Sequence, residues 1–421
     1  MVILYFKQAW EMMKQNRLYS SMYILGTAVT IAVVMMFFII IYIKLGPIYP
    51  EYNRNRMLYL NHIRFSINDG NNSGYSKSSY LLYDKLKAVE GCDAVTAVKI
   101  YNNKKPIPGL KNSTVLFASH TIWKVFDFDF LYGRGYTKED EDNNKSLPVV
   151  VVSEELAHNL YATSDVVGKE VEIDGVKHKV VGVVKNVSGS TPNVYANCWV
   201  PINSSLNNED YKRTETMLGG YKLFFLVSKN ENLEAVKARI SDIFFRFAQE
   251  QRQGNEYEPY INTHLKNEMG TGFGAKDTSF ILLLFITLLF IPALNLSGMI
   301  ASRMNSRMEE IGVRKAFGAT NRSIVLQVLT ENLFFTALGA LLGLLLSYIV
   351  AFTSQEWIVT LFDTVNLNAH YPTTVTIEML LNPTVILVTM LLVLLLNIIS
   401  ALLPAIYSLR HSITVSLNNK K

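Results

Sequence analysis

Four stretches of the chain carry almost no charge and are long enough to cross a membrane. They cover residues 18–45, 280–301, 324–352 and 384–403. A hydrocarbon core takes about 20 apolar residues, and backbone inside it can satisfy its own hydrogen bonds as a helix. One such stretch could be a buried core helix, but four together favour membrane spans. The pattern predicts an α-helical membrane protein with four transmembrane helices and a large α+β extracytoplasmic domain between helices 1 and 2.

This pattern also sets the expected boundaries along the chain. They are an interfacial helix at 1–17, transmembrane helix 1 at 18–45, an α+β core domain at 46–276, transmembrane helix 2 at 277–301, an elbow at 302–323, transmembrane helix 3 at 324–352, a short loop at 353–383, transmembrane helix 4 at 384–408 and a tail at 409–421. The first span is longer than the roughly 7–15 apolar residues of a signal peptide. We therefore interpret it as a retained anchor.

Composition agrees with a membrane protein. The 421 residues are 49% hydrophobic and 18% charged, whereas soluble domains average about 25% charged residues. The net charge of +5 is mild and gives no reason to expect a nucleic-acid partner.

Basic side chains flank the spans unevenly, and this predicts an orientation. They are Lys7, Lys14 and Arg17 before the first span, Arg303, Arg307, Arg314, Lys315 and Arg322 between the second and third, and Arg410, Lys420 and Lys421 after the fourth. Residues 353–383 contain no lysine or arginine. Because basic loops stay in the cytoplasm, both termini and the elbow are predicted to be cytoplasmic. Residues 46–276 are then predicted to face outward.

The first seventeen residues have their own amphipathic pattern. Phe6, Trp10 and Met13 recur at helical spacing, with Lys7 and Lys14 beside them. This is typical of a helix lying on membrane lipid, although a frayed tail is the alternative.

Alternating helical and strand patterns fill residues 46–276. Residues 80–89 and 233–244 have helical periodicity, and "LPVVVVSEELAHNLY" indicates a buried strand followed by a helix capped by Ser153. Asp174-Gly175 is typical of a tight hairpin turn. About 230 residues exceed one ordinary core, so we expect two lobes.

Candidate chemistry in this domain is sparse. Cys92 and Cys198 could form a disulfide or remain separate thiols, and the spacing decides neither. None of the histidines pairs at metal-ligand spacing. We interpret His178, between two lysines, as a surface residue, and the acidic run 138–145 as a solvated loop rather than a cation site.

The segment "GTGFGAKDTS" (270–279) resembles a phosphate-binding loop only superficially. Ala275 separates Gly274 from Lys276, and Asp277 stands where a Ser or Thr hydroxyl is required. We interpret the segment as a flexible joint before transmembrane helix 2. No cofactor is expected to bind this chain directly.

Polar and small residues within the spans are candidates for helix packing or dimer contacts, because they are costly in lipid or allow close approach. They are Pro292, Asn295, Glu331, Gly339 and Gly343.

The elbow carries the most distinctive pattern in the chain. Charged residues form one helical stripe and Met304, Met308 and Ile311 form the next, with Gly318 placed to end a helix and Thr320 to begin another. This favours a protein-docking surface, with a lipid anchor as the alternative. The candidate docking residues are Arg307, Glu309, Glu310, Ile311, Gly312, Arg314, Lys315, Phe317 and Gly318.

These residues resemble the MacB/FtsX-type ABC transporter permease family. The matching positions of the elbow and adjoining spans are Asn295, Arg307, Glu310-Ile311-Gly312, Arg314-Lys315-Ala316, Gly318-Ala319 and Glu331. Residues 131–140, 149–175 and 179–187 are similar to that family's periplasmic core domain, and residues 6–34 to its first crossing.

The resemblance implies a permease in the bacterial inner membrane that pairs with a second permease copy, as a homodimer or related heterodimer. A separate cytoplasmic ATPase subunit would bind ATP, dock on the elbow and drive motion of the periplasmic domain. An efflux system with a periplasmic adaptor and outer-membrane channel is the first hypothesis. Lipoprotein release or control of cell-wall hydrolases is the alternative within the family. A membrane sensor or structural protein without an ATPase is the alternative from another class.

Overall fold

A computed structural model describes most of the chain as two compact units. It covers residues 10–11, 13–15, 17–67, 72–101, 105–107, 110, 113–144, 147–207, 216–251, 256–271, 283, 286–287, 290, 297–298, 300–302, 308–354 and 381–409. A helical unit takes Met1–Tyr42, Gly274–Phe362 and Val375–Lys421, and an α+β unit takes Ile43–Phe273 and Asp363–Thr374. Each unit is described separately below.

Among the residues that the structure describes, the helical unit contains three helices that are long and apolar enough to cross a membrane. They are α2 (Arg17–Leu45), α12 (Asn321–Thr353) and α15 (Pro383–Leu409), with spans at Ser20–Leu45, Asn321–Thr353 and Pro383–Leu402. A shorter helix, α11 (Met308–Ala316), precedes α12. Most of the predicted interfacial helix (1–17), second span (277–301), short loop (353–383) and tail (409–421) lies outside the described residues. The described residues therefore account for three of the four predicted spans.

The α+β unit is built on one mixed sheet. Its strands are β1 (Met57–Ile67), β2 (Asn72–Ser78), β3 (Cys92–Tyr101), β4 (Val115–Ala118), β5 (Phe130–Gly133), β6 (Val149–Ser153), β7 (Glu170–Ile173), β8 (Val176–Val184), β9 (Cys198–Pro201), β10 (Leu218–Gly219), β11 (Lys222–Val227) and β12 (Glu256–Thr263). The order is β10-β2-β1-β11-β3-β4-β9-β6-β8-β5, with β12 beside β1 and β7 beside β8. Pairs β4–β9 and β6–β8 are parallel, and the other pairs are antiparallel.

Short and long helices cover this sheet. They are α3 (Tyr80–Leu86), α4 (Ile122–Val125), α5 (Lys138–Asp142), α6 (Glu154–Tyr161), α8 (Leu233–Glu250) and α9 (His264–Thr271), with single 3-10 turns η1 (Arg54–Arg56) and η2 (Ser205–Asn207). Helices α3 and α8 pack side by side against β1, β3 and β11. Helix α6 packs on β6 and β8.

Separate hydrophobic clusters fill the two ends of the sheet. Leu60, Phe225, Val236, Ile240 and Phe244 belong to the cluster beneath α3 and α8. Val150, Val152, Leu156, Val183 and Val200 belong to the cluster beneath α6. The strands from β3 through β4 to β9 join the two ends. The predicted two lobes therefore share one sheet.

Several local predictions for this unit are confirmed. The Ser153 hydroxyl accepts a hydrogen bond 3.2 Å long from the Leu156 backbone N–H at the start of α6. Asp174 and Gly175 both have positive φ, 47° and 85°, in the turn between β7 and β8, as a type I′ hairpin requires. The α8 helix buries the predicted apolar side.

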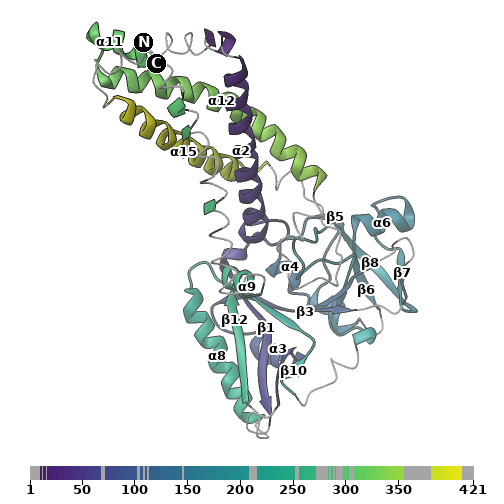
Figure 1. The fold of residues 1–421 in the computed structure, drawn as a ribbon. Coiled ribbons are helices and arrows are strands. Elements are labelled where there is room, and N and C mark those ends of the chain that lie inside the picture. The colour runs from purple at the N-terminus through teal and green to yellow at the C-terminus, as the bar shows by residue number, and fades with distance from the viewer. Residues whose placement is uncertain are drawn as a thin grey trace. The chain divides into compact units, whose positions relative to one another are not determined.

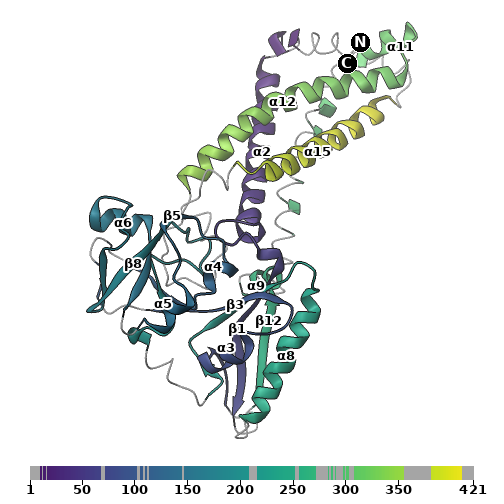
Figure 2. The same cartoon turned by 180° about the vertical axis from the view of Figure 1, so that it is seen from behind.

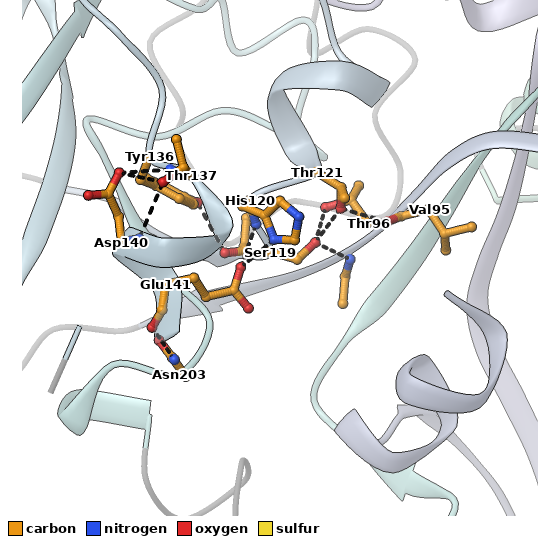
Figure 3. A network of polar contacts seen from close by, with 12 residues as sticks. Val95, Thr96, Ser119, His120, Thr121, Tyr136, Thr137, Asp140, Glu141 and Asn203 are labelled. Atoms are coloured by element: carbon orange, nitrogen blue, oxygen red, sulfur yellow. Dashed lines mark hydrogen bonds and ion pairs between the residues drawn. The ribbon is translucent and has the colours of Figure 1, made fainter. Parts of the chain in front are cut away.

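Within the acidic run, residues Lys138–Asp142 form helix α5, so the prediction of a solvated loop is wrong for this part of the run. Thr137 and Asp140 form a capping box that starts α5, and such a box satisfies exposed N–H groups at a helix start. The helix turns Glu141 inward, where its Oε2 lies 2.7 Å from the His120 backbone nitrogen and 2.9 Å from His120 Nδ1. Figure 3 shows this carboxylate facing His120 within a larger polar network. Glu141 therefore has a structural partner inside the fold.

The prediction that His178 is a surface residue is also wrong. Its side chain is fully buried, and its Nδ1 lies 2.9 Å from the Val176 carbonyl oxygen. The strand alternation turns His178 to the opposite face from Lys177 and Lys179. Burial lowers the pKa of His178 to about 4. The imidazole is therefore neutral at pH 7.

Both cysteines are free thiols. Cys198 is buried in β9 and Cys92 is half-buried at the start of β3. Burial raises the pKa of the Cys92 thiol to about 12 and also raises that of Cys198. Neither thiol forms a disulfide in the described fold.

Acid should destabilise the α+β unit through His178. The unfolded imidazole titrates at its ordinary pKa of 6.5 and the folded one at about 4. The unfolded state thus gains a proton first as pH falls between these values. The free energy of unfolding should then drop by about 3 kcal/mol across this window. Thermal unfolding of the solubilised chain at pH 7 and pH 5 measures the part of this loss that falls between those pH values, about 2 kcal/mol.

A His178→Phe variant should lose less stability between the two pH values, because the apolar ring has no proton to gain. His158, exposed on α6, provides the control: His158→Gln should retain the pH dependence of the unaltered chain. An unchanged pH dependence in His178→Phe would contradict the assignment.

Candidate functional site

A tight turn joins α11 to α12 and defines the elbow. Gly318 has φ +87°, and its N–H lies 3.0 Å from the Lys315 carbonyl oxygen. The Ala319 N–H reaches the Arg314 carbonyl at 3.0 Å, and this pattern closes a helix C-terminus. Thr320 then caps α12 by accepting a hydrogen bond 3.3 Å long from the Ser323 N–H. The predicted helix end at Gly318 and helix start at Thr320 are confirmed.

A chain of polar side chains ties the elbow helix to α12. Arg314 donates to Glu310 Oε1 at 2.6 Å within α11 and to Gln327 Oε1 at 2.5 Å on α12. Gln327 donates in turn to Glu331 Oε1 at 2.9 Å. Gln327 and Glu331 are buried. The half-exposed ion pair alone is worth about 1 kcal/mol or less, so the link matters more for orienting α11 than for stability.

The two sides of α11 have different surroundings. Ile311 and Gly312 are buried, and Ile311 belongs to a cluster with Ile324 and Val328 of α12. Their expected place on the exposed docking face is therefore wrong, because the packing of α11 on α12 covers that side. Val313 and Phe317 are exposed instead, and Phe317 is 89% exposed. Phe317 was among the predicted docking residues, whereas Val313 was not.

The remaining predicted residues of the elbow are only partly described. Glu310 is exposed, and Arg314 and Lys315 are half-buried. Arg307 lies outside the described residues, as does the side chain of Glu309. The described face available to a partner thus combines an aromatic ring, a valine and nearby charges. Aromatic side chains are enriched at the centres of protein interfaces, and polar and charged side chains surround them at the rim.

Gly339 and Gly343 allow α12 to approach α2 of the same chain. A Cβ on Gly339 would lie 2.8 Å from Thr27 Cβ, and one on Gly343 would lie 2.7 Å from the Ala28 carbonyl oxygen. Neither separation leaves room for a methyl group. The two glycines therefore serve packing within the helical unit, and their predicted role in a dimer stays a prediction.

Buried polar groups add contacts among α2, α12 and α15. Asn397 of α15 accepts from the Tyr23 hydroxyl at 3.4 Å and donates to the Thr336 hydroxyl of α12. The Thr336 hydroxyl donates to the Asn332 carbonyl at 2.8 Å. These groups cost less in lipid when bonded to each other. The predicted packing residue Glu331 lies in α12. Pro292 and Asn295 are outside the described residues.

The described residues contain no group of three or more His, Cys, Asp or Glu side chains placed to hold a metal ion.

Two family models match successive parts of the chain. The MacB-like periplasmic core domain matches residues 20–243, and the FtsX-like permease C-terminal domain matches residues 280–413. The first match alone covers more than half of the chain. The chain belongs to the MacB/FtsX-type family of ABC transporter permeases.

Known relatives share this family at low identity. The uncharacterized ABC transporter permease YknZ of Bacillus subtilis is 23% identical over 271 residues, which cover 62% of this chain and 64% of YknZ. The macrolide export ATP-binding/permease protein MacB of Wolinella succinogenes is 22% identical over 290 residues, covering 66% of this chain and 42% of that protein. The chain thus spans less than two thirds of either relative.

A solved structure of the periplasmic region of MacB from Actinobacillus actinomycetemcomitans is also similar. It is 15% identical, covers 48% of this chain and 88% of the solved chain, and gives a TM-score of 0.36.

A larger side chain at Gly343 should loosen the helical unit. In Gly343→Val, the new side chain would collide with the α2 backbone, and such overpacking costs about 1–3 kcal/mol. Gly298 is the matched control, since a Cβ there meets nothing within 4 Å. Thermal unfolding of the detergent-solubilised variants should show a lower midpoint for Gly343→Val and a near-native one for Gly298→Val. Equal midpoints would contradict close packing of α12 on α2.

Proposed function

We propose that this chain is the permease subunit of an ABC transporter, and that a separate cytoplasmic ATPase subunit docks on its elbow. The observation that carries the proposal is the 89% exposed Phe317 at the turn between α11 and α12. A fully exposed phenylalanine is costly in water and suits a pocket on a partner. Val313 extends this surface, and Glu310 and Arg314 flank it.

The proposed transporter lies in the bacterial inner membrane with four spans and with both termini in the cytoplasm. Two permease copies, identical or related, pair within it. The uneven distribution of lysine and arginine supports this orientation. The ATPase subunit binds and hydrolyses ATP, and the permease carries no chemistry of its own.

Motion is proposed to travel from the elbow along α12 to α2. The Arg314–Gln327–Glu331 link makes α11 move with α12, and the glycine contact makes α12 move with α2. The last residues of α2 belong to the α+β unit. There the buried Arg54 guanidinium donates to the Ile43 carbonyl at 2.9 Å and the Gly46 carbonyl at 2.8 Å. A helix end held in this way would pass displacement into the α+β unit.

The most favoured setting is efflux with a periplasmic adaptor and an outer-membrane channel. The names of relatives such as the macrolide export protein MacB support export as the process. In this proposal the α+β unit is the periplasmic part that contacts the adaptor.

Replacing Phe317 by a charged residue should abolish docking of the ATPase. The permease, carrying an affinity tag, is co-expressed with an ABC ATPase from the same genome, and the co-purified ATPase is quantified. Phe317→Asp should reduce it at least tenfold, because a carboxylate cannot enter an apolar pocket. Phe317→Leu should retain most of it. Phe317 takes no part in the Arg314 contacts with Glu310 and Gln327, so we expect both variants to keep the fold of the elbow. Undiminished co-purification in Phe317→Asp would overturn the docking surface.

A flexible insertion should uncouple ATP hydrolysis from export. A Gly-Ser segment placed after Leu45, at the end of α2, would separate that helix from the α+β unit and absorb displacement between them. ATPase activity should persist while export falls to background. The same insertion between β1 and β2 should leave both intact. Normal export with the insertion after Leu45 would count against mechanical transmission from α2 to the α+β unit.

A further inference from the structure

A pocket of about 330 Å³ opens beside the end of α2 in the α+β unit. Its size is at the lower end of the range for small-ligand pockets, roughly 300–1,000 Å³. Leu45, Pro47, Tyr52 and Leu265 supply most of its wall. Leu45, Tyr52 and Leu265 are exposed by 37%, 41% and 52%. Large apolar side chains from two stretches of the chain, residues 45–52 and Leu265, thus meet at one exposed hollow.

The charged group that lines the pocket is already satisfied by the fold. Arg54 is only 4% exposed. Its Nε donates to Glu51 Oε2 at 2.7 Å, and its Nη1 donates to the carbonyl oxygens at the end of α2. The guanidinium is therefore engaged inside the domain and is poorly placed to receive an anion.

The histidine in the pocket is satisfied as well. His264 Nδ1 lies 3.0 Å from the Tyr59 hydroxyl, and its Nε2 lies 2.8 Å from the Lys44 carbonyl oxygen. A neutral imidazole fits both contacts, with Nε2–H donating and Nδ1 accepting. Burial, followed by the charge of Arg54, lowers the pKa of His264. Neither Arg54 nor His264 presents a free charge, and the exposed Asn55 is the neutral polar side chain of the lining, so the pocket offers mainly apolar contact.

The position of the pocket along the chain sets its depth relative to the membrane. Leu45 is the last residue of the candidate span Ser20–Leu45, which has 26 residues. A helix of that length extends about 39 Å, whereas the hydrocarbon core is about 30 Å thick. The end of α2 therefore reaches the headgroup region. Tyr52 is the amphipathic aromatic type that is enriched at this level.

We propose that the pocket takes up an acyl chain of a phospholipid from the leaflet next to the α+β unit. The unit would thereby rest on the lipid surface through Leu45, Tyr52 and Leu265. Three observations favour lipid over a protein partner: the exposed apolar wall, the internally satisfied Arg54 and His264, and continuity with the end of a membrane span. The proposal requires that α2 crosses the membrane, and it is independent of ATPase docking.

Spin labels can place these side chains in lipid or in water. The full chain carries a nitroxide at Leu265→Cys or, separately, at Tyr52→Cys. Each is reconstituted in nanodiscs of phosphatidylethanolamine and phosphatidylglycerol. Power saturation then compares collisions with oxygen, which concentrates in lipid, and with a water-soluble nickel chelate. Leu147→Cys is the matched control, because Leu147 is a 71% exposed leucine of the same unit. The unaltered chain, treated in parallel, gives the background from Cys92 and Cys198.

We expect the ratio of oxygen to nickel accessibility to be at least threefold higher at positions 265 and 52 than at position 147. Equal ratios at all three positions would mean that the wall faces water and would overturn the proposal. Low accessibility to both agents at positions 265 and 52 would mean that protein covers the pocket, which overturns it too. The two independent label positions keep the test valid if one variant fails to fold.

Discussion

The contact of α12 with α2 at Gly339 and Gly343 is the constraint on which the helical unit depends. Hydrophobic burial does not drive helices together within lipid, because the lipid tails are as apolar as the side chains. Association then relies on backbone proximity and on polar groups that bond across helices. Gly339 and Gly343 bring the α12 backbone close to Thr27 and Ala28 of α2. Asn397 supplies the polar bonds across helices, to Tyr23 and Thr336. Both kinds of contact converge on α12.

The elbow extends this arrangement beyond the apolar part of α12. Arg314 crosses from α11 to Gln327, and Gln327 continues to Glu331 one turn further along. Ile311 fills the space beneath. Because these contacts hold one side of α11, the opposite side is left free, and it carries Val313 and Phe317. The exposed surface is thus a consequence of how the buried side is fixed.

The sequence predicts the features that are governed by local rules. Apolar runs locate the three spans that the described residues contain, and short-range chemistry locates the caps at Ser153, Gly318 and Thr320 and the turn at Asp174-Gly175. Prediction from the sequence fails where contacts between distant segments determine which side chains are buried. The choice of which side of α11 is buried depends on α12, so periodicity alone placed Ile311 on the wrong side. His178 and Glu141 differ from expectation for another reason: the signal for each is local, in strand alternation and in the Thr137–Asp140 capping box, and the charged neighbours of each residue obscure it.

The two thiols have a consequence for how this domain can mature. Cys92 and Cys198 are unpaired, and burial raises the pKa of each, so the reactive thiolate is scarce at neutral pH. The α+β unit is held together by its sheet and its hydrophobic clusters and has no covalent cross-link to form. Its folding therefore needs no oxidising enzyme and no electron acceptor. A cell growing without oxygen could assemble it as readily as one growing in air.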